Sequence, residues 1–309
     1  MTCNAVIILC LPHFLLFMSS EKFKSLLQEN KTLVMGVLNV TPDSFSDGGA
    51  FLTTELAVKH ASQMLADGAD IIDIGGQSTR PPGSAYGKGA VNVSLQEELY
   101  RVLLVIKNLA ALHPEILISI DTTKSEVARQ ALVSGATIIN DVSGATEDET
   151  MLDLASEKNV PIILMHGYGP QFSKTKIEEY HYENVVDEVF DWLKKRIALA
   201  KVKGIDIVLG DIGFGFAKKA EDNISLLRDH KKFIDLGVPM VLGVSRKSTI
   251  GKILGGVPPS ERINGSLAAS VYGATNGAKI IRTHDVKQTV EALKVADVLW
   301  QMMNDQLIT

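Results

Sequence analysis

Polar side chains capable of chemistry stand repeatedly at the end of short apolar runs in this sequence. In the stretch MGVLNVTPDSFSDGG (Met35–Gly49), an apolar run ends at Asn39 and leads to Asp43 and Asp47. Comparable sets follow seven further runs: Gly75 to Arg80, Asp121, Asn140 with Asp141, Met165 with His166, Asp211, Ser245 to Ser248, and Arg282 with His284 and Asp285. If the runs are strands of one parallel sheet, these residues meet at its carboxyl edge and form one site.

The charges of these residues divide the expected site in two. Cations gather after the last two runs, at Lys247 and Arg282, and they suit an anion such as a phosphate group. Ser248 is expected to open a helix there, whose N-terminal amides would add affinity for an anion. Acceptors follow the third, fourth and sixth runs, at Asp121, Asn140 and Asp211. They suit a flat heterocycle with several N–H groups, because a carboxylate accepts two parallel N–H bonds.

The elements that must position these residues can be read from hydrophobic periodicity. Apolar, β-branched runs of strand length lie at 33–38, 70–74, 116–120, 136–140, 161–165, 206–210, 239–243 and 278–282. Helical periodicity lies between them, most clearly at 57–65, 95–112 and 184–203. Continuous apolar strands that alternate with helices indicate a parallel sheet buried on both faces. Eight such units favour an α/β fold of the (β/α)8, or TIM, barrel type over an open doubly wound sheet.

Composition limits the classes of partner and the compartment. The 309 residues are 46% hydrophobic and contain no linker or low-complexity segment, so one barrel domain is expected over 23–309. The net charge of −5 gives no basic footprint, which argues against nucleic-acid and membrane partners. The two cysteines, Cys3 and Cys10, lie at the start of the chain. The remainder therefore has no thiol nucleophile or disulfide, which suits a reducing compartment.

Residues 1–22 are expected to be an N-terminal extension. Their apolar run, about Ala5–Met18, is short for a membrane span and is broken by Pro12 and His13. The segment lacks the positively charged start of a secretory signal. A targeting segment is the alternative interpretation.

Eight motifs together resemble the dihydropteroate synthases, pterin-binding enzymes of folate biosynthesis. They are MGVLNVTPDSFSDGG, DIGGQSTRP, ISIDTTK, IINDVSG, ILMHG, DIGFGFAK, GVSRKSTIG and IIRTHDV, and they run from about Thr32 to the C-terminus in the family's order. The resemblance implies a transferase that joins 6-hydroxymethyl-7,8-dihydropterin diphosphate to p-aminobenzoate and releases pyrophosphate, with Mg²⁺. It also implies a cytoplasmic homodimer and a target of sulfonamides.

The matching motifs imply roles for individual residues. The pterin is expected to contact Asp121, Asn140, Asp211 and Lys247, and Met165 is also expected to bind substrate. Arg282 and His284 are expected at the diphosphate, and Asn39 at the magnesium ion. The p-aminobenzoate site is expected to include Phe45, Thr79, Pro81, Phe216, Lys247 and Ser248. The catalytic set implied by the resemblance is Asp47, Arg80, Asp121, Lys247, Arg282 and His284.

The family's reaction is dissociative, so its chemistry needs electrostatic stabilisation rather than a strong base. The sequence departs from the family at Gln77, Pro82 and Ile212, and the segment 167–176 shows no family pattern. None of these departures removes a proposed catalytic group.

Other interpretations remain open for single residues and for the whole chain. Asp121 could help to start a helix in which Thr123 and Glu126 form a capping box, and His166 could either contact a ligand or pack a loop. A cobalamin-dependent methyltransferase shares the barrel and several pterin contacts. Lys247 at a strand end nominally suits a Schiff-base aldolase, and a paralogue could bind pterin without turnover.

Overall fold

Eight parallel strands close into a barrel in chain order, from β1 through β8 and back to β1. The computed structural model describes residues 18–40, 50–77, 93–167, 169 and 177–308. The strands are β1 (Leu33–Asn39), β2 (Ile71–Gly75), β3 (Leu117–Asp121), β4 (Ile138–Asp141), β5 (Ile162–Met165), β6 (Val208–Asp211), β7 (Met240–Leu242) and β8 (Ala278–Thr283). The predicted TIM barrel is confirmed, and the open sheet is wrong.

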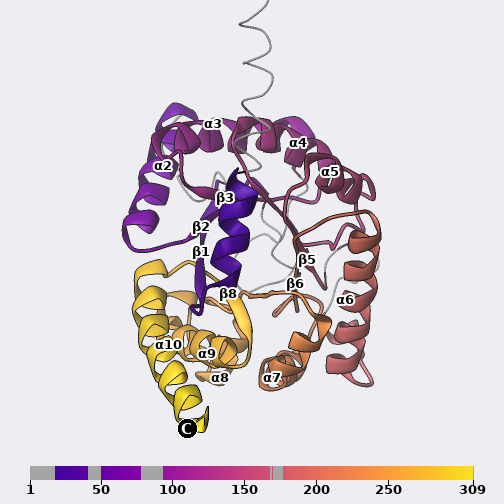
Figure 1. The fold of residues 1–309 in the computed structure, drawn as a ribbon, viewed down its shortest axis with the longest axis vertical. Coiled ribbons are helices and arrows are strands. Elements are labelled where there is room, and N and C mark those ends of the chain that lie inside the picture. Colours follow the sequence, from indigo (N-terminus) through magenta and orange to yellow (C-terminus); the bar gives the residue numbers. More distant parts are fainter. Residues whose placement is uncertain (1–17, 41–49, 78–92, 168, 170–176, 309) are drawn as a thin grey trace, which may run out of the picture.

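Helices follow the strands and surround the barrel (Figure 1). They are α2 (Ala50–Ala66), α3 (Leu95–Leu112), α4 (Ser125–Ser134), α5 (Thr150–Lys158), α6 (Val185–Val202), α7 (Ala220–Arg228), α8 (Ser248–Ile253), α9 (Ile263–Thr275) and α10 (Val286–Ile308). Short 3₁₀ helices are η3 (Ile177–Glu179), η4 (His230–Leu236) and η5 (Pro259–Glu261). The segments predicted from periodicity are α2, α3 and α6, whose apolar faces pack outside the barrel.

The interior of the barrel changes from apolar to polar along the strands. Its apolar layer consists of Leu33, Met35, Ile71, Leu117, Ile138, Ile163, Leu209, Val241 and Ile280. Side chains alternate between the two faces of a strand, so residues two or four positions further on share this inward face. Those residues include Asp73, Asp121, Asn140, Met165, Asp211 and Arg282. The period of two therefore places the polar groups together at the carboxyl ends.

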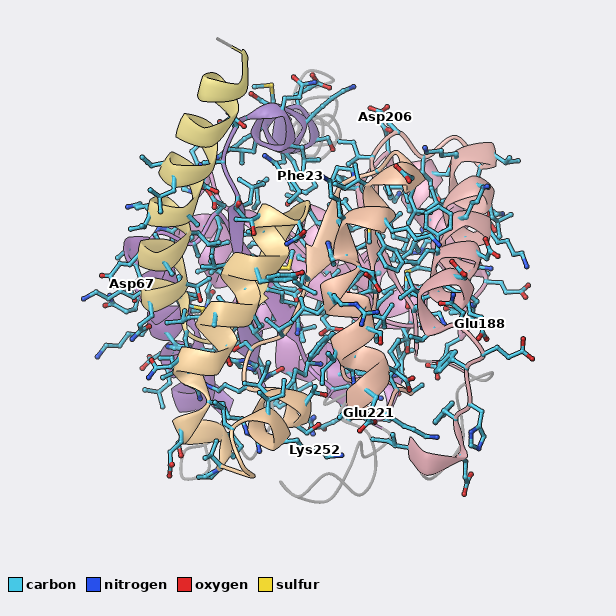
Figure 2. The ribbon with its side chains drawn as sticks, turned by 90° about the horizontal axis from the view of Figure 1, so that it is seen from below. Phe23, Asp67, Glu188, Asp206, Glu221 and Lys252 are labelled. Atoms are coloured by element: carbon cyan, nitrogen blue, oxygen red, sulfur yellow. The ribbon has the colours of Figure 1, made fainter. Side chains whose placement is uncertain are left out.

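A helix over residues 18–28 closes the opposite end of the barrel. It lies across the strand ring in Figure 1, where it is indigo. Phe23 is fully buried in the inner apolar layer, with Leu26 and Leu27 packed against it. Figure 2 shows Phe23 toward one end of the molecule and Lys252, in the helix α8 that follows β7, at the other. The division of the chain at residue 22 stays a prediction.

Among the described helices, none is long and apolar enough to cross a bilayer.

Candidate active site

Arg282 lies at the centre of the polar end of the barrel and joins two carboxylates from other strands. Its Nε donates to Asp73 Oδ2 at 2.7 Å, and its Nη2 donates to Asp121 Oδ2 at 2.7 Å. Burial opposes a charge on Arg282, but the carboxylates of Asp73 and Asp121 outweigh this effect and raise its pKa. The guanidinium is therefore a permanent cation. Its side chain is 21% exposed. A ligand in the mouth of the barrel, the opening at the carboxyl ends of the strands, can therefore reach it.

Asp73 also orients the amide of Asn140. Asn140 Nδ2 donates to Asp73 Oδ1 at 3.3 Å and to Oδ2 at 3.1 Å. With its NH₂ group committed to Asp73, Asn140 has its carbonyl oxygen available as an acceptor. Asp73 is fully buried, and a buried carboxylate requires such partners. It therefore holds Asn140 and Arg282 in fixed orientations.

Asp121 has one oxygen without a hydrogen bond to any described residue. Asp121 Oδ2 accepts from Arg282, whereas Oδ1 is buried without a partner among the described residues. Burial raises the pKa of Asp121 to about 7, although Arg282 acts in the opposite direction. Since buried acceptors are normally satisfied, Oδ1 is suited to accept an N–H bond from a ligand.

The third acid, Asp211, ends β6 beside Met165 of β5. Asp211 Oδ1 accepts from the Gly213 N–H at 2.7 Å. Burial raises the pKa of Asp211, while the Gly213 N–H, Lys247 and Arg282 are the main opposing influences. Lys247 Nζ also lies 4.0 Å from the centre of the Phe216 ring, within the range of a cation–π contact. Asp211, Lys247 and Phe216 thus form one wall of the mouth.

His284 is a neutral imidazole in this environment. Burial lowers its pKa to about 3, helped by Arg282, Arg246 and Lys247. Ser245 Oγ accepts from the His284 backbone N–H and lies 3.2 Å from Nδ1. If the Ser245 hydroxyl donates to Nδ1, the ring proton is on Nε2. His284 can then donate one hydrogen bond to an anion but adds no charge.

Asn39 lies at the end of β1 and lines a cavity of about 570 Å³ together with His284. The cavity is also bounded by α2 side chains, including Lys59 and Gln63. In the described ranges, no three acid, histidine or cysteine side chains are grouped as a metal site. The amide oxygen of Asn39 is nevertheless a ligand type that Mg²⁺ accepts, since this ion keeps waters and takes phosphate oxygens.

The comparisons with known proteins agree with this geometry. Residues 35–284 match the family model described as pterin binding enzyme. The dihydropteroate synthase of Synechocystis is 45% identical over 273 residues, covering 88% of this chain and 91% of the relative.

The chain belongs to the pterin-binding enzyme family. Within it, the chain groups with the dihydropteroate synthases, which are transferases of folate synthesis.

Solved structures of dihydropteroate synthases share the fold. The Xanthomonas albilineans enzyme with 4-aminobenzoic acid has 43% identity and a TM-score of 0.78, covering 89% of this chain and 93% of that chain. The same organism's enzyme in complex with 7,8-dihydropteroate has 41% identity and a TM-score of 0.75, covering 90% of this chain and 95% of that chain.

The structure brings most of the residues expected from the family motifs to one end of the barrel. Asp121, Asn140, Met165 and Asp211 are at strand ends, and Ser248 is the first residue of α8, as predicted. Five expected residues lie outside the described ones: Phe45, Asp47, Thr79, Arg80 and Pro81. Their roles remain predictions.

The alternative role for Asp121 as a helix start is wrong. At the start of α4, Asp148 and not Asp121 accepts from the Ser125 N–H, at 2.8 Å. Thr123 instead donates to Glu147 at 2.7 Å. Asp121 is therefore committed to the mouth through Arg282 and not to α4.

Gln77, a departure from the family pattern, belongs to a polar network at the end of β2. Lys124 Nζ donates to Gln77 Oε1 at 2.7 Å and to the buried Glu98 at 2.5 Å. Arg101 also donates to the Gly76 carbonyl at 2.7 Å. These contacts anchor Gly76 and Gln77, which follow β2, to α3 and to the segment after β3.

Two buried polar residues of the site were not predicted from the sequence. Asp73 interrupts an otherwise apolar strand, and this charge inside a buried run was the available signal. Lys218 is 2% exposed and contacts His166, which packs against the loop after β6. A lysine in a polar segment is usually solvated, so the sequence contains no comparable signal for Lys218.

Proposed function

We propose that this enzyme condenses 6-hydroxymethyl-7,8-dihydropterin diphosphate with p-aminobenzoate to give 7,8-dihydropteroate and pyrophosphate. The observation that carries the proposal is Asp121 Oδ1, a buried oxygen with no hydrogen-bond partner among the described residues. It lies in a mouth that also offers the Asn140 carbonyl and the Asp211 carboxylate. A pterin ring has the matching set of N–H donors, and one of them would satisfy Asp121 Oδ1, which is buried without a partner among the described residues.

The diphosphate would bind on the cationic side of the same mouth. Arg282 uses one N–H of Nε and one of Nη2 for Asp73 and Asp121, and a guanidinium has five N–H donors in all. The remaining donors can bind phosphate oxygens without releasing the two acids. Neutral His284 would add one N–H bond.

Magnesium fits this site as a partly hydrated ion. Asn39 would supply one amide oxygen, while the diphosphate and water would supply the other ligands. When bound, the ion would neutralise charge on the diphosphate leaving group.

The p-aminobenzoate would lie on the other side of the pterin methylene carbon. Phe216 and Lys247, which are in contact in the structure, would flank its ring. Its carboxylate would lie near Ser248 at the start of α8. Phe45, Thr79 and Pro81 remain expected contributors to this site, and Asp47 and Arg80 remain expected members of the catalytic set.

The reaction would proceed by separation of charge. The bond between the pterin methylene carbon and the diphosphate oxygen breaks, and its electron pair leaves with the diphosphate. Arg282 stabilises that leaving anion, while the carboxylate of Asp121 stabilises the pterin cation. The neutral arylamine of p-aminobenzoate then forms the C–N bond and loses a proton. This step needs no strong base.

The proposal is tested by incubating the purified protein with the pterin diphosphate, p-aminobenzoate and Mg²⁺. Dihydropteroate and pyrophosphate should appear in equal amounts, and EDTA should suppress both. Formation of neither product would refute the proposal. A requirement for cobalamin would favour a methyltransferase, and trapping of Lys247 by borohydride would favour an aldolase.

The expected cellular form is a homodimer in the cytoplasm. Sedimentation equilibrium of the purified chain and fractionation of cells that express it test these two expectations separately.

A further inference from the structure

The loop after β6 has an unusual backbone that places two residues of the site. It runs from Asp211 to Lys218, and it presents Phe216 to Lys247. Gly213, Gly215 and Ala217 all have positive φ, at 63°, 83° and 47°. The left-handed conformation is unfavourable for an L-residue other than glycine, so Ala217 needs compensating contacts.

The compensating contacts converge on the buried Nζ of Lys218. It lies 2.9 Å from His166 Nδ1, 3.0 Å from the Phe216 carbonyl oxygen and 3.1 Å from the Gly213 carbonyl oxygen. The His166 carbonyl is further away, at 3.4 Å. Lys218 therefore folds back over its own loop and ties that loop to the end of β5.

The three closest partners match the hydrogen-bonding capacity of a lysine head group. An ammonium has three N–H donors, one each for the two carbonyls and for His166 Nδ1. In a neutral amine, two N–H bonds would serve the carbonyls, and the lone pair would accept from His166 Nδ1–H. Both arrangements satisfy every partner, so the loop does not depend on the charge of Lys218.

The partners of Lys218 are themselves fixed by close packing. His166 is 3% exposed, and its ring lies edge-on to the Trp192 ring at 5.1 Å between centres. Its backbone N–H donates to the Asp211 carbonyl at 3.1 Å. At Gly213, an added Cβ would lie 1.6 Å from the His166 carbonyl oxygen. The end of β5 and the loop therefore meet too closely for another side chain.

A second tie joins the same loop to α8. Asn223 Oδ1 accepts from the Gly215 N–H at 2.7 Å, and Asn223 Nδ2 donates to Thr249 Oγ1 at 3.1 Å. Asn223 thus fixes the middle of the loop, and Lys218 fixes its two flanking carbonyls. The Phe216 carbonyl that Lys218 holds belongs to the same residue whose ring faces Lys247.

We propose that Lys218 is a positioning residue, which holds the loop after β6 so that Phe216 and Asp211 face the substrates. It acts through the carbonyls of Gly213 and Phe216 and through His166, without touching a substrate itself. This inference rests on the proposed function, because it assigns Phe216 to p-aminobenzoate and Asp211 to the pterin.

The substitution Lys218→Met tests the role, because methionine fills a similar buried volume but cannot donate. Lys219→Met is the matched control, since the Lys219 side chain reaches toward His181, outside the loop. We expect Lys218→Met to raise the KM for p-aminobenzoate on the order of tenfold or more, as misplaced contacts do. Lys219→Met should keep the wild-type constants. A purely structural loss would reduce the active fraction, and hence apparent kcat, at unchanged KM.

A pair of substitutions at His166 gives a second test, in which Lys218 is left unchanged. His166→Asn retains an acceptor oxygen near the position of Nδ1, and His166→Leu removes it. The proposal predicts that His166→Leu raises the KM for p-aminobenzoate severalfold more than His166→Asn does. Equal KM values for His166→Leu and His166→Asn would overturn it.

The crystal structure of the Lys218→Met variant decides the inference independently of turnover. We expect the Phe216 ring to leave Lys247 and the carbonyls of Gly213 and Phe216 to turn away from residue 218. An unchanged loop would overturn the inference even if the wild-type protein proved inactive. Wild-type inactivity alone would refute the proposed function, so the two failures are distinguishable.

Discussion

Arg282 Nη2 donates a 2.7 Å hydrogen bond to Asp121 Oδ2, and this bond joins β8 to β3 across the barrel. Through Nε the same guanidinium also joins β8 to Asp73 of β2. One cation therefore partly neutralises two buried acids before any substrate binds. In the proposed function this bond would couple the pterin and diphosphate parts of the site, because Arg282 would belong to both.

The first prediction concerns stability and pH. The pKa of Asp121 is raised from 3.8 to about 7, with burial as the largest cause. The folded protein thus binds this proton more tightly than the unfolded chain, so stability falls as pH rises from about 4 to about 7. Asp121→Asn removes this titration. We therefore expect the free energy of unfolding of Asp121→Asn, relative to that of the wild type, to increase as pH rises across that range. The variant should also lose activity.

Urea unfolding of both proteins at several pH values between 4 and 8 measures the difference. Two curves that stay parallel across this range would show that the Asp121 carboxyl does not titrate as expected. The exposed Asp191→Asn variant controls for removing a carboxylate from the chain.

The second prediction separates the diphosphate from the pterin. Arg282→Ala should weaken binding of the pterin diphosphate at least tenfold more than binding of the bare pterin alcohol. Hydrogen bonds to charged groups contribute about 1.5–3 kcal/mol, and only the diphosphate would use the remaining N–H groups of Arg282. Calorimetric titration with each compound tests this expectation, with the surface substitution Arg228→Ala as control. Equal losses for the two compounds would refute the assignment.

The barrel and the polar residues at the strand ends were predictable because they depend on local patterns. Each strand is a continuous apolar run, and the polar residue that ends it, such as Asn39 or Asp211, interrupts the run visibly. A chain that alternates such runs with amphipathic helices has few ways to bury them all.

The partners of the site residues were not predictable by the same reasoning. Asp73 lies within a strand whose inward and outward faces are both apolar. The sequence therefore does not reveal whether its side chain lies on the inward or the outward face. Its partners, Asn140 and Arg282, are 67 and 209 residues away. Lys218 depends likewise on a loop whose turns become visible only with the left-handed backbone at Gly213 and Ala217.

The third prediction concerns the acid at the end of β6. Asp211→Asn should weaken binding of the pterin diphosphate and of the pterin alcohol by a similar factor, about tenfold. In the proposed arrangement its carboxylate would face the heterocycle rather than the phosphates, and an amide replaces one acceptor with a donor. The same calorimetric pair measures the result. A loss confined to the diphosphate would place Asp211 on the wrong side of the mouth.

The fourth prediction concerns the helix over residues 18–28. Phe23 is fully buried in the inner apolar layer of the barrel, and Phe→Ala changes in cores cost about 3–5 kcal/mol. We expect Phe23→Ala to lower the free energy of unfolding by about that amount, with little change in the KM for either substrate. Denaturant unfolding tests it against the exposed control Lys24→Ala. A stability equal to that of the control would show that the helix does not seal the barrel in solution.

The fifth prediction concerns Asp73, the fully buried acid that holds both Arg282 and Asn140. Asp73→Asn keeps the shape of the side chain but removes its charge, so Arg282 loses one of its two carboxylate partners. Breaking a buried pair in this way costs about 3–5 kcal/mol. The free energy of unfolding should fall accordingly, and kcat/KM should fall with it, because the Asn140 carbonyl and the Arg282 donors lose their fixed orientations.

Denaturant unfolding and steady-state kinetics of Asp73→Asn, beside the surface control Asp67→Asn, measure both effects. The double variant with Arg282→Ala then shows whether the loss acts through the guanidinium, since residues that share a contact give non-additive free energies. If the Asp73 and Arg282 losses simply add, Asp121 alone positions Arg282. Strong non-additivity would make the Asp73–Arg282 pair the element that couples the pterin side of the mouth to the phosphate side.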